Sequence, residues 1–195
     1  MQTKDLLAFR ILLNSRSPRR KQILEQIGFE TKVVHTQTNE TFPATLRAEE
    51  IPVFLSEKKS LAYKERIGEK EILLSGDTMV FLDDEALGKP KDGADAFLML
   101  KKLSGRKHSV VSGCTLRTED KSVSFFEKTD VYFKHLSDEE INYYIQKYSP
   151  LDKAGAYGIQ EWIGMTGIEK IDGDYYNVMG LPTASLFENL KKIIY

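Results

Sequence analysis

Two adjacent arginines, Arg19 and Arg20, stand where a short polar loop passes into a predicted helix. An apolar stretch at 8–13 predicts a buried strand, Ser15 lies in the loop, and Pro18 suits the first turn of a helix. Cations at a helix N-terminus oppose the helix dipole by about 0.3–1 kcal/mol each, whereas backbone N–H groups there attract anions. Guanidinium groups also match the geometry of phosphate oxygens. The arrangement predicts a polyanion site, and a solvated surface turn is the alternative.

Carboxylates and further cations could complete such a site. Asp77 follows an apolar strand, where it could hold a divalent cation or accept a proton from an attacking water; capping a turn is the alternative. Lys89 lies across a predicted hairpin from Asp77, and Lys59 shares the apolar face of a predicted helix at 49–63, from which a lysine reaches either water or a cleft. If these groups converge with Glu40, the cations, a metal and a base would suit phosphoryl transfer.

Several other kinds of chemistry find no support in the sequence. It contains neither a G-x-x-x-x-G-K-[ST] loop nor a G-x-S-x-G elbow. His35, His108 and His135 have no common spacing, which argues against a zinc site. Cys114 lies in an apolar stretch and is expected to be a buried packing residue.

The bulk composition is that of an ordinary globular protein. The chain has 195 residues, enough for one domain with a real core, and 41% of them are hydrophobic. The net charge of −1 gives no reason to expect nucleic acid or a membrane surface as a partner. A single cysteine, with neither a signal-peptide pattern nor a transmembrane run, leads us to expect a cytoplasmic protein.

The order of predicted elements indicates a single α/β domain with a mixed sheet, because helices and strands alternate without a strict βαβ repeat. A glycine-rich stretch at 155–167 is expected to be irregular, with strand-like pieces, and 83–85 is expected to form a hairpin turn rather than a metal cluster. The apolar patterns predict helices at 18–27, 49–63, 94–103, 138–148 and from 182 onward, and strands at 8–13, 29–34, 72–74, 79–82, 108–118 and 122–135.

Six short motifs occur along the chain: SRSPRR at 15–20, GDT at 76–78, GKP at 88–90, LSG at 103–105, DKAGAYGIQ at 152–160 and GLP at 180–182. In these motifs and their order the chain resembles the Maf family of nucleoside triphosphate pyrophosphatases. The resemblance implies one domain over 1–195, with a two-lobed α/β fold, a mixed, strongly twisted sheet and a central cleft, similar to inosine triphosphate pyrophosphatases. It also implies a divalent cofactor, Mg²⁺ or Mn²⁺, and hydrolysis of a nucleoside triphosphate to monophosphate and pyrophosphate.

The resemblance assigns roles to individual positions. Asp77 would accept the proton of the attacking water, and Glu40 would hold the metal together with Asp77. Lys59 is the preferred match for one phosphate ligand, with neighbouring Lys58 as the alternative. The residues implied in substrate binding are Ser15, Arg19, Arg20, Lys59 and Lys89.

Three positions discriminate between substrate branches in this resemblance. Arg19, Thr78 and Gln160 match the dTTP/UTP branch, whereas the 7-methyl-GTP branch typically has tryptophan, glutamine and glutamate there. A neutral glutamine can both donate to and accept from the imide edge of a pyrimidine. Standard and modified pyrimidine nucleotides both stay open as substrates.

The sequence departs from the family pattern in three places. Asn14 replaces a usual alanine, Ser75 and Gly76 replace a common Gly-Ala pair, and Glu161 and Trp162 follow Gln160 where glycines are usual. The third departure lies beside the proposed base pocket, and it bears on the exact substrate more than on the reaction class.

Two other functions compete with hydrolysis. The chain could be a nucleotide-binding regulator of cell division or septum formation in which hydrolysis is incidental. Nucleic-acid binding through the arginine loop is a third hypothesis, against which the near-neutral net charge speaks. The expected partner is a nucleoside triphosphate, without nucleic acid or membrane, and a homodimer stays open.

Overall fold

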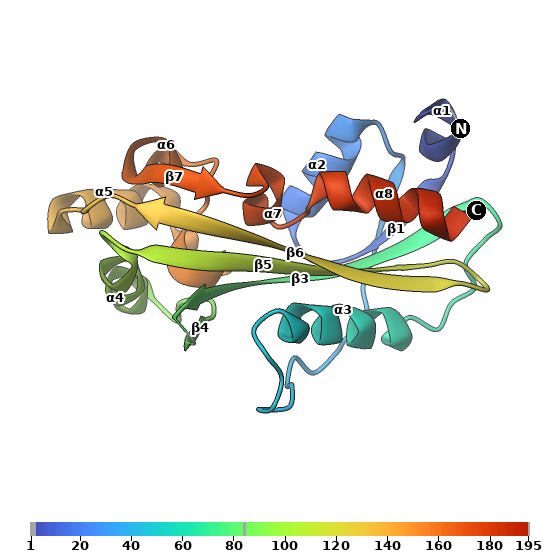
Figure 1. Ribbon diagram of the computed structural model, residues 1–195, viewed down its shortest axis with the longest axis horizontal. Helices are drawn as coiled ribbons and strands as arrows, with labels where there is room; N and C mark the ends of the chain where they lie inside the picture. Colours follow the sequence, from blue (N-terminus) through green and yellow to red (C-terminus); the bar gives the residue numbers. More distant parts are fainter. Residues whose placement is uncertain (1–2, 84, 195) are drawn as a thin grey trace. The chain divides into compact units, whose positions relative to one another are not determined.

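A mixed β-sheet forms the framework of the computed structural model, which describes residues 3–83 and 85–194 (Figure 1). Among these residues the sheet has seven strands in the order β2-β1-β3-β5-β6-β7, with β4 paired to β3. Strand β1 is parallel to β2 and β3, whereas the β3–β4 and β6–β7 pairs are antiparallel. The predicted α/β class with a mixed sheet is therefore confirmed. The strands are β1 (Arg10–Asn14), β2 (Thr31–Val34), β3 (Glu71–Leu82), β4 (Glu85–Leu87), β5 (Lys107–Arg117), β6 (Ser122–Phe133) and β7 (Ile168–Asp172).

Helices flank the sheet and join its strands. They are α1 (Thr3–Leu7), α2 (Pro18–Ile27), α3 (Glu50–Ala62), α4 (Gly93–Leu103), α5 (Asp138–Tyr148), α6 (Trp162–Gly167), α7 (Tyr175–Met179) and α8 (Thr183–Ile194), with 3₁₀ turns η1 (Pro150–Asp152) and η2 (Ala154–Ala156). No helix within the described residues has the length and apolar content that a membrane crossing requires.

The chain divides into two compact units, each described here by itself. The first unit contains residues 1–77, 112–127 and 180–195, and the second contains 78–111 and 128–179. Strands β3, β5 and β6 contribute residues to both units. The central cleft implied by the family resemblance stays a prediction.

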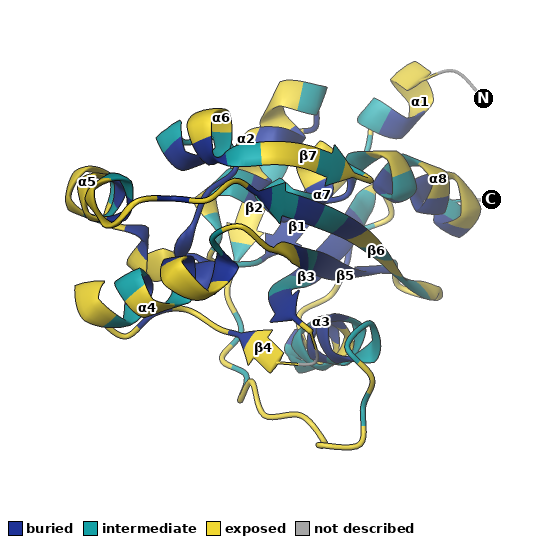
Figure 2. Cartoon of the chain, turned by 60° about the vertical axis from the view of Figure 1, so that its left-hand side comes forward, coloured by how far each residue is buried: buried dark blue, intermediate teal, exposed yellow. Residues whose placement is uncertain are grey.

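In the first unit, helices cover both faces of the sheet. Helix α3 lies on one face, and α2 and α8 lie on the other (Figure 1). Strands β1 and β3 are consequently apolar on both sides, and Leu13 and Leu74 are fully buried. The loop between β2 and α3 is largely exposed (Figure 2).

Local signals account for the boundaries of α2. The Ser17 side chain accepts a hydrogen bond from the Arg20 backbone N–H, and Pro18 occupies the first helical position. Gly28 ends the helix in the left-handed conformation, with φ of 107°. The helix spans Pro18–Ile27, as the sequence predicted.

Close contact between backbones fixes α3 on the sheet. Gly113 in β5 lies against the main chain of Pro52 and Val53, so that a Cβ atom at position 113 would overlap those main-chain atoms. Only glycine allows this approach.

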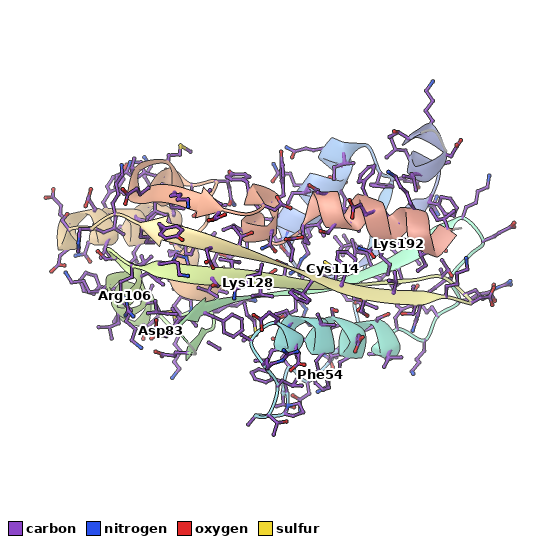
Figure 3. All side chains as sticks on the ribbon, viewed as in Figure 1. Phe54, Asp83, Arg106, Cys114, Lys128 and Lys192 are labelled. Atoms are coloured by element: carbon purple, nitrogen blue, oxygen red, sulfur yellow. The ribbon has the colours of Figure 1, made fainter. Side chains whose placement is uncertain are left out.

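Cys114, the next residue of β5, is buried (Figure 3). Burial raises the pKa of its thiol to about 12, which confirms Cys114 as a packing residue.

The second unit has its own apolar core beneath α4 and α5. The core includes Leu100 and Leu103 of α4 and the Tyr144 ring of α5, all essentially inaccessible to solvent. His108 shares this core, where its Nε2 lies 2.8 Å from the Tyr157 hydroxyl. Burial lowers the pKa of His108 to about 4, so this histidine is neutral and structural.

Three sequence predictions need correction or completion. Strand β3 continues through 75–78, where polar residues had suggested an interruption. The stretch at 155–167 contains the end of the 3₁₀ turn η2 and helix α6 in place of strand-like pieces. Helices α1 and α7 and strand β7 were not predicted. The β3–β4 hairpin is confirmed, with Asp84 outside the described residues; Asp83 forms an ion pair with Arg106 at 2.7 Å (Figure 3).

Replacement of Gly113 tests the backbone contact between β5 and α3. Gly113→Ala should lower the free energy of unfolding by about 1–3 kcal/mol, because the added methyl group must push α3 away. The matched control is Gly88→Ala, since a Cβ atom there has no neighbour within 4 Å. Urea unfolding of both variants measures the difference, and equal stabilities would contradict the contact.

Candidate active site

Arg20 connects three segments of the first unit that are distant in sequence. Its Nε donates to the Gly180 carbonyl at 2.7 Å, and its Nη1 donates to the Gly76 carbonyl and to Ser15 Oγ, both at 2.9 Å. Burial lowers the pKa of the guanidinium, and the nearby Asp77 carboxylate opposes that shift. Arginine keeps its charge even so, and this cation therefore holds together the loops that carry Ser15 and Asp77.

The two arginines of the sequence motif do not do the same thing. Successive helical residues point about 100° apart, so Arg19 and Arg20 leave α2 in different directions. Arg20 is buried, whereas Arg19 is only partly buried. The predicted phosphate contact of Arg19 and of Arg20 stays a prediction, and the structure gives Arg20 a structural role as well.

Lys59 lies between the two carboxylates named by the sequence. Its Nζ donates to Asp77 Oδ1 at 2.5 Å and lies 3.0 Å from Glu40 Oε1. The side chains of Lys59 and Asp77 are 15% and 17% exposed, whereas Glu40 is 65% exposed. One side of the site, formed by α3 and β3, is therefore largely buried. The other side, formed by the loop between β2 and α3 that carries Glu40, is exposed to solvent.

The structure distinguishes the two neighbouring lysines of α3. Lys58 Nζ donates to the Thr41 carbonyl at 3.1 Å and lies 5.9 Å from the centre of the Phe54 ring. It thus contacts the main chain of the exposed loop, whereas Lys59 contacts the carboxylates of Glu40 and Asp77.

Asn14 is a site component to which the sequence assigned no role. Its Nδ2 donates to Thr36 Oγ1 at 2.8 Å and to the Lys59 carbonyl at 2.9 Å, and lies 3.5 Å from Ser75 Oγ. The carbonyls of a final helical turn lack partners within the helix, and Asn14 supplies one for α3. Asn14 and Ser75 both depart from the family pattern, and their side chains contact each other in the interior. Through its bond to the Lys59 carbonyl, Asn14 also connects this contact to the residue that pairs with Asp77. The only sequence signal was a polar residue ending an apolar strand.

In the second unit, two motifs lie side by side. The Gly155 N–H donates to the Gly88 carbonyl at 3.0 Å, which joins the segment of Lys89 to the segment that leads to Gln160. Lys89 is exposed, and Thr78 is partly buried on β3. Because Lys89, Thr78 and Gln160 belong to this unit, their convergence with the arginines and Lys59 stays a prediction.

Gln160 presents a buried acceptor. Its Oε1 is inaccessible to solvent and accepts no hydrogen bond from the described residues. Leaving a buried polar atom unpaired costs about 1–3 kcal/mol, which a ligand with an N–H group could recover. The neighbouring Glu161 carboxylate accepts from the Tyr144 hydroxyl and lies 3.2 Å from Lys153 Nζ.

The carboxylates of Glu40 and Asp77 fit a divalent metal only in part. Within the described ranges, no group of three or more His, Cys, Asp and Glu side chains could hold a metal ion. Mg²⁺, however, is commonly bound by one or two carboxylates, with phosphate and water oxygens completing its shell. Two carboxylates that already face one cation, Lys59 Nζ, meet that requirement if the ligand brings phosphates.

Comparisons with known proteins agree with the sequence motifs. The sequence profile of a family described as Maf-like protein matches residues 10–193. A dTTP/UTP pyrophosphatase of Phocaeicola vulgatus is 47% identical over 191 residues, which cover 97% of this chain and 99% of that protein. A protein of the same name from Bacteroides fragilis is 46% identical, with 97% and 98% covered. Another from Flavobacterium johnsoniae is 42% identical over 194 residues, with both chains fully covered.

Arg20→Lys tests the buried guanidinium. A lysine ammonium cannot reproduce the planar fork that reaches three acceptors, so the variant should lose about 2–3 kcal/mol of unfolding free energy in urea. Arg16→Lys is the matched control, because Arg16 lies in the same loop and is exposed. If both variants unfolded at the same urea concentration, the role of Arg20 in joining the loops would be refuted.

Proposed function

The chain belongs to the Maf-like protein family, and from this premise we propose that it is a metal-dependent nucleoside triphosphate pyrophosphatase. Its proposed substrates are dTTP and UTP, standard or modified, and its products the monophosphate and pyrophosphate. The observation that carries the proposal is the Lys59 ammonium between the carboxylates of Glu40 and Asp77. A base, a cation and a second carboxylate in one place suit hydrolysis of a phosphoanhydride.

Asp77 is the proposed proton acceptor. Water would attack the α-phosphorus, its proton would pass to the Asp77 carboxylate, and the bond to the bridging oxygen would break to release pyrophosphate. The hydrogen bond described for Asp77 uses Oδ1, which leaves Oδ2 for the water. Without a bound metal Lys59 holds this carboxylate, and Arg20 fixes the adjacent main chain through the Gly76 carbonyl.

The remaining cations would bind the phosphates. Arg19 lies in the first turn of α2, where backbone N–H groups and the helix dipole already favour anions. Arg19 and Lys89 are the proposed phosphate ligands of the two units. The Ser15 hydroxyl, which accepts from Arg20 Nη1, is a further proposed ligand. Charge developing on the leaving pyrophosphate would be offset by these groups.

A divalent metal, Mg²⁺ or Mn²⁺, is the proposed cofactor, held by Glu40 and Asp77. When bound, it would neutralise phosphate charge and polarise the reacting phosphoryl group. Lys59 occupies the space between the same two carboxylates, so its flexible side chain would move toward the phosphates as the metal enters. Asn14 would hold the Lys59 main chain in place during that exchange.

Gln160 is the proposed reader of the base, together with Arg19 and Thr78. Its buried Oε1 is an acceptor without a protein partner among the described residues. The N3–H of uracil and thymine is a donor of the required kind, whereas cytosine has an acceptor at N3. This matches the relatives, which are named dTTP/UTP pyrophosphatases.

The reaction is tested with dTTP, UTP, CTP, GTP and 7-methyl-GTP in the presence of Mg²⁺ or Mn²⁺, with the products resolved. We expect pyrophosphate release, fastest from dTTP and UTP, and a fall in kcat of about 10²–10⁴-fold for Asp77→Asn with the fold intact. Release of orthophosphate would refute the proposed bond cleavage, and an active Asp77→Asn would remove Asp77 as the base. Tight nucleotide binding without turnover would favour the alternative function, a nucleotide-binding regulator of cell division.

Metal binding is tested by calorimetry with Mn²⁺ alone. Glu40→Gln should weaken Mn²⁺ binding about tenfold or more, because it removes one of two carboxylate ligands. The matched control is Glu57→Gln, an exposed acid on α3. Lys59→Met should bind Mn²⁺ more tightly than the wild type, since no ammonium competes for the carboxylates. Equal affinities of wild type, Glu40→Gln and Lys59→Met would refute the site.

A further inference from the structure

A single hydroxyl closes the segment that carries Gln160. The Tyr144 hydroxyl accepts from the Gly158 N–H at 3.0 Å and donates to the Glu161 carboxylate. The Glu161 N–H also donates to the Gly158 carbonyl at 3.0 Å. Gln160 therefore sits in a tight turn whose two ends are joined to each other and to α5.

A second contact holds Glu161 from another direction. Lys153 Nζ lies 3.2 Å from Glu161 Oε1 and 2.7 Å from Asp152 Oδ1. The Lys153 and Glu161 side chains are only 9% and 18% exposed, so water screens their attraction weakly. The two oxygens of Glu161 thus have different partners, and the carboxylate cannot rotate without breaking one contact.

The turn is also closely packed by side chains. A Cβ atom at Gly158 would lie 2.9 Å from Glu161 Cδ and 3.1 Å from Lys153 Cε, which is closer than side chains normally pack. Tyr144 is equally fixed, because its ring is fully buried and stacks on Tyr148 with centroids 5.2 Å apart. Tyr144, Glu161 and Lys153, which we call the clamp, are therefore closely packed around the turn.

The position of this turn matters because a side-chain amide can hydrogen-bond to either of two kinds of pyrimidine base, depending on which of its ends faces the base. A glutamine that presents its oxygen accepts from the N3–H of uracil or thymine, and the same amide turned over donates to N3 of cytosine. Discrimination between these bases requires that one orientation be held. Gln160 Oε1 is buried and accepts no hydrogen bond from the described residues, so the turn that carries its main chain is the candidate for holding that orientation.

We propose that Tyr144, Glu161 and Lys153 are positioning residues that hold Gln160 in the orientation that selects uracil and thymine over cytosine. This inference rests on the proposed pyrophosphatase function and adds three residues to its selectivity. It also gives a role to Glu161, which departs from the glycine usual in the family pattern. None of the three residues needs to touch the nucleotide.

The decisive variant is Tyr144→Phe, which removes one hydroxyl and keeps the buried ring. We expect the ratio of kcat/KM for UTP to that for CTP to fall about tenfold, through a higher KM for UTP with little change in kcat. Tyr148→Phe is the matched control, because it removes a hydroxyl from the neighbouring turn of α5 and from the other ring of the stacked pair. Its UTP/CTP ratio should equal that of the wild type.

A conservative pair of variants separates positioning from folding. Glu161→Gln can still accept from Tyr144 and should keep part of the selectivity, whereas Glu161→Ala loses both contacts and should lose most of it. Thermal melts accompany each variant. A UTP/CTP ratio that stays at the wild-type value in Tyr144→Phe and Glu161→Ala, with or without a lower Tm, would overturn the proposal.

Binding measurements keep this inference distinct from the proposed reaction. In an Asp77→Asn background, calorimetry gives the Kd values of UTP and CTP whether or not the chain turns them over. A preference for UTP that Tyr144→Phe abolishes supports the clamp, even if the product assay refutes pyrophosphate release. Absence of any preference for UTP in that background would overturn the clamp, even if hydrolysis is confirmed.

Discussion

One buried cation organises the candidate active site. The Arg20 guanidinium gives its hydrogen bonds to the carbonyls of Gly76 and Gly180 and to Ser15, so a loop, a strand and the start of the C-terminal segment share one charged group. A buried charge is tolerated only when such partners surround it. The position of Asp77, one residue beyond Gly76, therefore depends on an interaction made within the protein and not with the substrate.

The two units hold different parts of the candidate site. In the first unit Lys59 lies between two carboxylates, and Asn14 donates to the Lys59 carbonyl. The second holds Gln160 in a turn closed by neutral and charged hydrogen bonds. In the proposed function Asp77 and Gln160 have different roles, and the contacts described around Asp77 share no residue with those around the turn of Gln160.

The sequence predicted what depends on neighbouring residues and missed what depends on distant ones. The bounds of helix α2 were predicted correctly because its first-turn proline, its apolar stripe and the glycine that follows it all act locally. Strand β3 was broken too early, since backbone pairing with β1 carries it through Ser75 despite the polar side chains. The roles of Arg20 and Asn14 could not be inferred, because their partners lie up to 160 residues away. The candidate cations and carboxylates were predicted from residue type and position, whereas the substrate-binding role of Ser15 and the selectivity roles of Thr78 and Gln160 came from the family resemblance.

The contact of Gly113 with α3 has a consequence for how the chain can evolve. At Gly113 the helix that carries Lys59 meets β5 through main-chain atoms. Substitutions elsewhere in the core can change the packing around α3 without changing this spacing. Drift among apolar residues would therefore leave the distance between helix and sheet nearly constant, while a change at this one glycine would shift every residue of α3 at once.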